Sequence, residues 1–404
     1  MTGNTESMLA RFRRRFWLPP RAHGEVILDR SVSFLELFYD LVYVVVISRA
    51  AHTLAGSVSW RAVGEFAAIF GLIWLAWLNG TLYYELHGRE DGRTRLYVFV
   101  QMLLLAVLAV FTGDAASGGG APFAVAYAGY LAVLSWLWYT VRRRDSDEYM
   151  AITGRYLIGM VASIAVVAAS ALLPASTRTL VWGALVVGWV VLSTLIARSN
   201  KLVFGVSVTD SMVERFGLFV IIVLGEMVVG VVDGLSAGGR SVRPLATGML
   251  GLIVGFAYWW TYFDYVGSRL PFDTPRIRMR WMVAHLPVSM SIAAAGAAMV
   301  SLVRHSADAA TPVATSWLLT GAVTAGLLSL VLVMSTLRDA EIEPTLYRPV
   351  SRALVGAAAI SLGWGWLQPA PWLLALLLVV TLGVVWLFAV DRWLRLDEGK
   401  QTPG

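Results

Sequence analysis

Two carboxylic acids, Glu36 and Asp40, stand four residues apart at the start of the first long apolar run of the sequence. Residues four apart lie on the same face of an α-helix, so these two side chains would lie close together. Two nearby carboxylates repel each other, and one of them can hold a proton at neutral pH, which is the electrostatic setting of a proton or cation site. The alternative is that both carboxylates form ion pairs with a basic residue, for which Arg30 and Arg215 are the candidates.

A second set of ionisable residues lies deeper in the apolar runs. Glu214 begins one run, and Glu226 follows at a distance of about 18 Å along a helix axis. Arg49 lies 13 residues after Glu36 in the first run, and Glu226 lies 12 residues after Glu214. Arg49 and Glu226 would therefore lie at about the same depth along their helices. Because each charge alone is expensive in an apolar medium, we predict an ion pair between Arg49 and Glu226. Without that pair, Glu226 becomes a candidate titrating site.

Asp264 and His285 complete the set of candidate site residues. Asp264 ends a run rich in Trp and Tyr, and His285 lies just before a proline inside another run. A histidine can carry protons near neutral pH, and the alternative is a hydrogen-bonded packing residue. We expect one polar cluster, near the same ends of their helices, to contain Glu36, Asp40, Glu214, Asp264 and His285.

The elements that must position these residues are helices that span a membrane. Of the 404 residues, 58% are hydrophobic and 14% are charged, whereas soluble domains carry roughly 25% charged residues. Lipid is the solvent that accepts so much apolar surface. Cysteine is absent and His is scarce, so the sequence predicts no metal site and no cofactor. The net charge of +6 is distributed as membrane topology requires, and we predict a lipid bilayer rather than nucleic acid as the partner.

A transmembrane helix needs about 20 mostly apolar residues, and the sequence contains about twelve such runs. Glycine and proline clusters separate them, as expected of loops. The fold class is therefore all-α and polytopic. The expected helices occupy residues 34–55, 61–84, 95–113, 121–141, 156–174, 179–198, 212–233, 245–266, 281–303, 312–336, 349–368 and 371–391.

The basic residues predict the orientation of the chain. Lys and Arg accumulate on the cytoplasmic side of membrane proteins. With the N-terminus inside, 26 of the 32 Lys and Arg fall in cytoplasmic segments. The sequence therefore predicts a multi-pass protein of the plasma membrane with both termini in the cytoplasm.

The chain also repeats itself. At a shift of 185 residues Trp74 aligns with Trp259 and Asn79 aligns with Asp264, and at a shift of 178 Glu36 aligns with Glu214. Six helices per half is an even number, so the two repeats would be parallel. We predict a basic N-terminal segment at 1–30, six-helix repeats at 31–200 and 207–395, and a short cytoplasmic tail at 396–404.

Two long motifs resemble those of the bacterial low temperature requirement protein A family. They are FLELFYDLVYV at 34–44 and the segment from Glu214 through Glu226, and shorter matches occur at 262–264 and 285–287. The resemblance covers nearly the whole chain and implies a bacterial membrane protein, without implying a mechanism. Met227 departs from the small polar residue that is usual in this family, which removes a hydroxyl beside Glu226.

Three functions are compatible with these features. No motif of a common enzyme is present, and the loops are too short for a separate catalytic domain. The sequence favours a transporter or channel for a proton, another cation or a small solute, because it combines a repeat with intramembrane carboxylates. The alternatives are a membrane sensor or scaffold with structural ion pairs, and an intramembrane enzyme acting on a lipid-soluble substrate.

Overall fold

The computed structural model describes residues 16–25, 32–198, 207–238 and 241–401, and its fold is all-helical. The basic residues Arg11 to Arg15 and Arg30 lie outside the described residues. Each predicted run forms a helix. The largest differences are that α6 begins nine residues before the predicted position, at Asp147, and that α14 ends ten residues after it, at Gln401. The helices are α2 (Phe34–Gly56), α3 (Trp60–His87), α4 (Gly92–Thr112), α5 (Gly120–Arg142), α6 (Asp147–Ser170), α7 (Ala175–Arg198), α8 (Asp210–Gly238), α9 (Val242–Tyr265), α10 (Pro275–Arg304), α11 (Val313–Met334), α12 (Asp339–Ile342), α13 (Pro344–Leu367) and α14 (Pro371–Gln401).

Among the described residues, 11 helices are long and apolar enough to cross a membrane, and α2 is the long helix outside that set. Its charged residues lower its apolar content, yet their placement suits a membrane helix. Glu36 and Asp40 are buried against neighbouring helices. The exposed side of the same stretch is a stripe of apolar residues, which includes Phe38, Leu41 and Val45. An apolar exterior around a polar interior is what lipid requires of a spanning helix.

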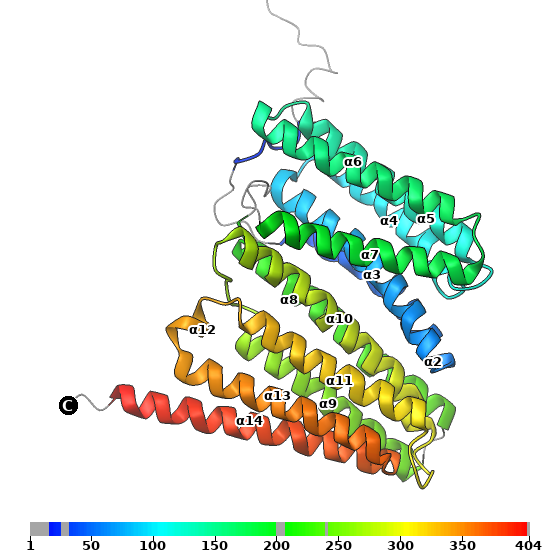
Figure 1. Ribbon diagram of the computed structural model, residues 1–404, viewed down its shortest axis with the longest axis vertical. Coiled ribbons are helices and arrows are strands. Elements are labelled where there is room, and N and C mark those ends of the chain that lie inside the picture. The colour runs from blue at the N-terminus through cyan, green and yellow to red at the C-terminus, as the bar shows by residue number, and fades with distance from the viewer. Residues whose placement is uncertain (1–15, 26–31, 199–206, 239–240, 402–404) are drawn as a thin grey trace, which may run out of the picture.

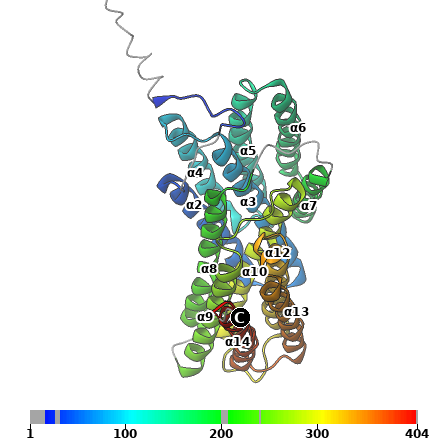
Figure 2. The same ribbon diagram turned by 90° about the vertical axis from the view of Figure 1, so that its left-hand side faces the viewer.

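The long helices lie side by side across the long axis of the molecule, with α5 and α6 at one end and α13 and α14 at the other (Figure 1). The view from the left-hand side shows α2 to α7 above α8 to α14 (Figure 2). α10 lies where the two groups meet. It packs against α2, α3 and α7 of the first group and against α8, α9 and α11 of the second.

The main packed pairs of helices in the first group have counterparts in the second. In the first, α2 packs on α3 and α4, and the further packed pairs are α3·α7, α4·α5, α5·α6 and α6·α7. In the second, α8 packs on α9 and α10, and the further pairs are α9·α14, α10·α11, α11·α13 and α13·α14. With the short helix α12 left aside, these pairs correspond one to one in chain order. They support the proposal that the chain contains two parallel six-helix repeats.

Two glycines allow α8 and α10 to approach closely. A Cβ atom at Gly230 of α8 would overlap the carbonyl oxygen of Gly296 of α10. A Cβ atom at Gly296 would lie 2.6 Å from the backbone oxygen of Glu226. Small residues at a helix crossing let backbones come together, which is the main source of packing energy between helices in lipid.

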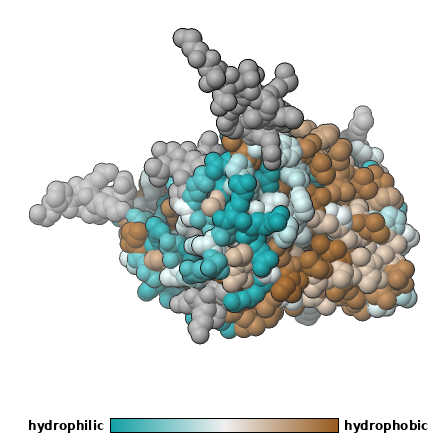
Figure 3. Space-filling model, turned by 90° about the horizontal axis from the view of Figure 1, so that it is seen from above, coloured by the Kyte–Doolittle hydropathy of each residue, from teal (hydrophilic) through white to brown (hydrophobic). Residues whose placement is uncertain are grey.

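Polar residues gather at one end of the helices. Viewed from above, the hydrophilic side chains lie mostly on the left and the hydrophobic side chains mostly on the right (Figure 3). The left is also the side on which the C-terminus lies in Figure 1. At this end Arg269 forms an ion pair with Asp339, which joins the loop after α9 to α12. An isolated β-bridge between Pro271 and Leu337 joins the loop after α9 to the segment just before α12.

We expect Gly230→Ala to destabilise the protein, because its methyl group must displace the backbone of α10. Overpacking of this kind costs about 1–3 kcal/mol. Gly225→Ala is the matched control on the same helix, since no atom lies within 4 Å of its Cβ position. Thermal unfolding of the purified variants checks the prediction, and an equal melting temperature for both would contradict the close crossing of α8 and α10.

We propose that the polar end, at which α5 ends and α6 begins, faces the cytoplasm. Reporter fusions after Gly119 and after Arg144 join the reporter to opposite ends of α5. The first should be active only with a periplasmic reporter and the second only with a cytoplasmic one. Two fusions reporting the same compartment would refute this topology.

Candidate functional site

Glu36 helps to start α2 as well as contributing charge to the site. Ser33 is the N-cap, and its hydroxyl accepts a hydrogen bond of 3.3 Å from the backbone N–H of Glu36. In return the carboxylate of Glu36 accepts one of 3.0 Å from the backbone N–H of Ser33. This reciprocal capping box satisfies N–H groups that would otherwise lack partners at the helix start. The cap therefore fixes where α2 begins, and with it the position of Asp40 one turn further.

Arg215 of α8 joins both carboxylates of α2. Its Nη2 lies 3.1 Å from Oδ1 of Asp40 and its Nε lies 3.3 Å from Oδ2, so the guanidinium binds this carboxylate through two hydrogen bonds. Its Nη1 lies 3.4 Å from Oε1 of Glu36. Asp40 is 0% exposed, Arg215 2% and Glu36 5%. We call Glu36, Asp40 and Arg215 the charge cluster; it links the first group of helices to the second.

Aromatic side chains enclose the charge cluster. The indole N–H of Trp77 on α3 donates a 2.9 Å hydrogen bond to Oδ1 of Asp40. The Trp77 ring stacks on Phe219 at a centroid distance of 4.1 Å and meets Phe216 edge-on at 5.0 Å. The guanidinium carbon of Arg215 lies 5.9 Å from the centroid of the Tyr39 ring, within the range of a cation–π interaction. Three helices, α2, α3 and α8, therefore surround one carboxylate.

The structure shows Glu36 and Asp40 in an ion pair with Arg215, which was one of the two interpretations of these carboxylates. A buried ion pair offsets the desolvation of its charges only when its geometry is good and the remaining lone pairs are bonded. The two contacts from Arg215 and the one from Trp77 meet that condition at Asp40. Removal of Arg215 would therefore leave Asp40 buried in a medium of low dielectric constant without its counter-charge.

A group of buried tyrosines lies beside the charge cluster. The hydroxyl of Tyr43 donates to that of Tyr130 on α5 at 2.7 Å, and Tyr39 makes a short hydrogen bond to Tyr130. Gly80 provides the space, because a Cβ atom there would lie 2.8 Å from the Tyr39 hydroxyl. Sequence reasoning missed this group. The available signal was the spacing of Tyr39 and Tyr43, which places both on one face of α2.

His285 lies next to the charge cluster without touching it. Its Nδ1 lies 2.8 Å from the carbonyl oxygen of Trp281, which can only accept, so Nδ1 carries the proton. Its Nε2 lies 3.1 Å from the hydroxyl of Tyr262. Phe216 contacts both His285 and Trp77, with ring centroids 4.9 and 5.0 Å away. The geometry corresponds to the hydrogen-bonded packing residue, which was one of the two interpretations of this histidine.

Glu214 and Asp264 do not join the predicted polar cluster. Both are exposed, although Glu214 is adjacent in sequence to the buried residue Arg215. Successive residues of a helix are about 100° apart around its axis, so Glu214 points away from the pocket that Arg215 enters. Asp264 lies one residue before the end of α9. The prediction of a five-residue cluster was therefore wrong for these two carboxylates.

The predicted ion pair between Arg49 and Glu226 does not occur among the described residues. Glu226 is buried at 3% exposure and lines a small pocket together with His52 of α2. Arg49 is exposed, whereas the adjacent residue Ala50 is buried. The two depths match as predicted from the sequence, but the two side chains point in different directions around their helices.

We expect Arg215→Gln to be strongly destabilising, by about 3–5 kcal/mol, because it leaves Asp40 buried beside Glu36 without the guanidinium. Asp40→Asn combined with Arg215→Gln should recover part of that loss, since the buried charge of Asp40 is then removed as well. Arg49→Gln is the control, because a substitution at an exposed position away from the site should change stability by less than about 0.5 kcal/mol. Thermal unfolding of the natural protein, the single variants Asp40→Asn and Arg215→Gln, and the double variant gives the coupling. A double variant as damaged as the sum of the two single variants would contradict direct contact.

Comparisons with known proteins identify the sequence family of this chain. Residues 31–389 match the model of the family described as bacterial low temperature requirement A protein. An uncharacterized protein of Rhizobium meliloti (strain 1021) is 28% identical over 249 residues, a match that spans 58% of this chain and 58% of that protein. No solved structure matches. Because the family match includes α2 to α11, α13 and most of α14, with the charge cluster inside it, the chain belongs to the bacterial low temperature requirement A protein family.

Proposed function

We propose that this protein is a proton-coupled transporter of a small solute in the plasma membrane, with Asp40 as its proton site. The observation that carries the proposal is that Asp40 is fully buried where the two groups of helices meet, and that its charge is balanced from the other group by Arg215. A buried ionisable residue in a membrane helix is a functional candidate by default because of its cost. At this position, a change in its charge acts on the contact between the groups.

The charge cluster provides a way for proton binding to alter that contact. A proton that reaches a carboxylate oxygen of Asp40 from the aqueous side neutralises it and removes its attraction for Arg215. The guanidinium keeps a counter-charge within reach, because Glu36 lies 3.4 Å from its Nη1. Asp40 can then separate from α8 as a neutral acid, without an isolated charge being left in the apolar interior. Release of the proton to the other side restores the pair.

The proposed repeat supplies the movement that transport requires. In transporters built from repeats, alternating access arises largely from one unit rocking against the other around a central site. Here α2 and α8 would be the first helices of the two units, and the charge cluster joins them. The tyrosine hydroxyls of α2 and α5 lie beside it, and each can donate and accept a hydrogen bond. Together these features favour proton-coupled transport over a static scaffold.

Proton movement in proteoliposomes tests the proposal. Vesicles that contain a trapped pH-sensitive dye and a potassium diffusion potential report proton entry while a panel of uncharged and cationic small solutes is added. We expect proton entry with at least one solute for the natural protein. Asp40→Asn should abolish it, because an amide cannot release or take up a proton in this range.

Asp264→Asn is the matched control, since it makes the same chemical change at an exposed carboxylate outside the charge cluster. It should leave proton entry unchanged. Proton entry that persists in Asp40→Asn would overturn the role of Asp40. A natural protein that moves no protons with any solute would overturn transport and favour the sensor or scaffold, and chemical conversion of an added lipid-soluble compound would favour an enzyme.

A further inference from the structure

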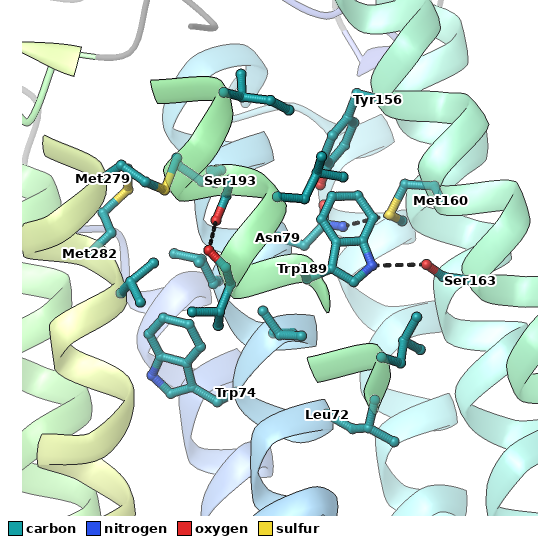
Figure 4. A pocket seen from close by; sticks show the side chains of 18 of the residues that line it. Leu72, Trp74, Asn79, Tyr156, Met160, Ser163, Trp189, Ser193, Met279 and Met282 are labelled. Carbon is teal, nitrogen blue, oxygen red and sulfur yellow. Dashed lines mark hydrogen bonds between the residues drawn. The ribbon is translucent and has the colours of Figure 1, made fainter. Parts of the chain in front are cut away.

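A cavity with a volume of about 160 Å³ lies between α3, α5, α6, α7 and the start of α10. Figure 4 shows Trp74 and Leu72 of α3, Met160 and Ser163 of α6, and other side chains around it. An apolar cavity of about 150 Å³ in another protein holds a benzene ring. The space is therefore large enough for a single six-membered ring with a small substituent.

The lining of the cavity selects for an uncharged, mostly apolar molecule. Leu, Val, Ile, Met and aromatic side chains form nearly all of the wall, and among the described residues that line it there is no Asp, Glu, Lys, Arg or His. A charged ligand would lose its hydration and gain no counter-charge there. An apolar one gains from burial, since well-formed apolar pockets with a few polar groups are the usual form of a small-molecule site.

Asn79 is the main polar group on this wall, and its amide is held in a fixed orientation. Its Oδ1 accepts a 3.0 Å hydrogen bond from the indole N–H of Trp138. Its Nδ2 lies 3.0 Å from the sulfur of Met160. A thioether is a weak acceptor, so an oxygen atom of a ligand would make a stronger hydrogen bond to the amide N–H than Met160 does.

The cavity has an exposed lining residue on one side and lies near the charge cluster on the other. Leu192, one of its lining residues on α7, is 47% exposed on a surface that faces lipid in a membrane. On the other side Trp74 contacts Trp77, with ring centroids 6.3 Å apart, and Trp77 is hydrogen-bonded to Asp40. We infer that a lipid-soluble molecule enters beside Leu192 on α7. The indole ring of Trp74 lies between the cavity and Trp77, and Trp77 binds Asp40.

We propose that the cavity binds an uncharged, lipid-soluble molecule that carries a hydrogen-bond-accepting oxygen, such as a carbonyl group, and that this is the chemical class of the transported solute. The oxygen accepts from the amide N–H of Asn79, and the apolar part lies against Trp74, Leu75 and Met282. Its presence acts on Asp40 through Trp74 and Trp77. The identification of the bound molecule as the transported solute depends on the proposed function, whereas the binding site itself does not.

Photolabelling in lipid nanodiscs tests the site with a diazirine derivative of acetophenone as the probe. Peptides of α6 and α7 should carry the label. Acetophenone and α-methylstyrene then serve as competitors of nearly equal shape, which differ in that a CH₂ group replaces the carbonyl oxygen. After correction for their concentrations in the membrane, acetophenone should compete about five-fold better, as expected of one hydrogen bond.

Three variants make the test specific. Ser193→Trp fills the cavity from α7 and should abolish labelling of α6 and α7, while Val191→Trp places the same side chain on the exposed side of α7 and should not. Asn79→Leu should remove the difference between the two competitors. Equal competition in the natural protein, or undiminished labelling in Ser193→Trp, would overturn the site.

The binding result and the transport result can be separated. Nanodiscs have no gradient, so labelling and competition are measured without any transport. If the cavity binds as expected and Asp40→Asn still moves protons, the binding site stands and the proposed function falls. If Asp40→Asn abolishes proton movement and the two competitors remain equal, the function stands and the site is wrong.

Discussion

The cost of placing a charge in hydrocarbon is the constraint on which the centre of this structure depends. Asp40 and Arg215 can both be buried only because each compensates the other, with Trp77 supplying a further hydrogen bond. That requirement brings α2 to α8 at one depth and orients the indole ring on α3. The Trp77 ring in turn packs on Phe216 and Phe219 of α8. One ion pair thus determines how three helices from two groups meet.

The remaining contacts between helices follow the rules of packing in an apolar solvent. Lipid offers no hydrophobic drive for two helices to associate, so close fit and small side chains provide the energy. The buried middle of α10 consists largely of small residues from Ser291 to Ala298. Gly296 of α10 meets the α8 backbone at Glu226, and Gly230 of α8 meets the α10 backbone at Gly296. A bulky residue at this crossing would separate α8 from α10 and also disturb the α2–α8 contact at the charge cluster.

The extent and type of the helices could be predicted from the sequence, because apolar length and interrupting glycines and prolines are local properties. The site could be predicted only in part. Depth along a helix follows from residue number, which is why Arg49 and Glu226 are level, but direction around a helix follows from packing that a single sequence does not contain. Arg49 continues the exposed stripe of Leu41 and Val45, at intervals of four residues, and so points away from α8. Arg215 was recognised only as one of two alternative partners, because a choice between them requires the contact between α2 and α8.

The proposed repeat explains why the charges at the centre are opposite. At the shift of 178 residues that aligns Glu36 with Glu214, Asp40 aligns with Leu218 and Arg215 aligns with Leu37. Identical halves would place carboxylate against carboxylate, or leucine against leucine, across the contact between α2 and α8. A carboxylate in one half and a guanidinium in the other give attraction instead, and a contact that a single proton can weaken. In the proposed mechanism, the divergence of two aligned positions converts a passive contact between the proposed repeats into one that responds to protonation.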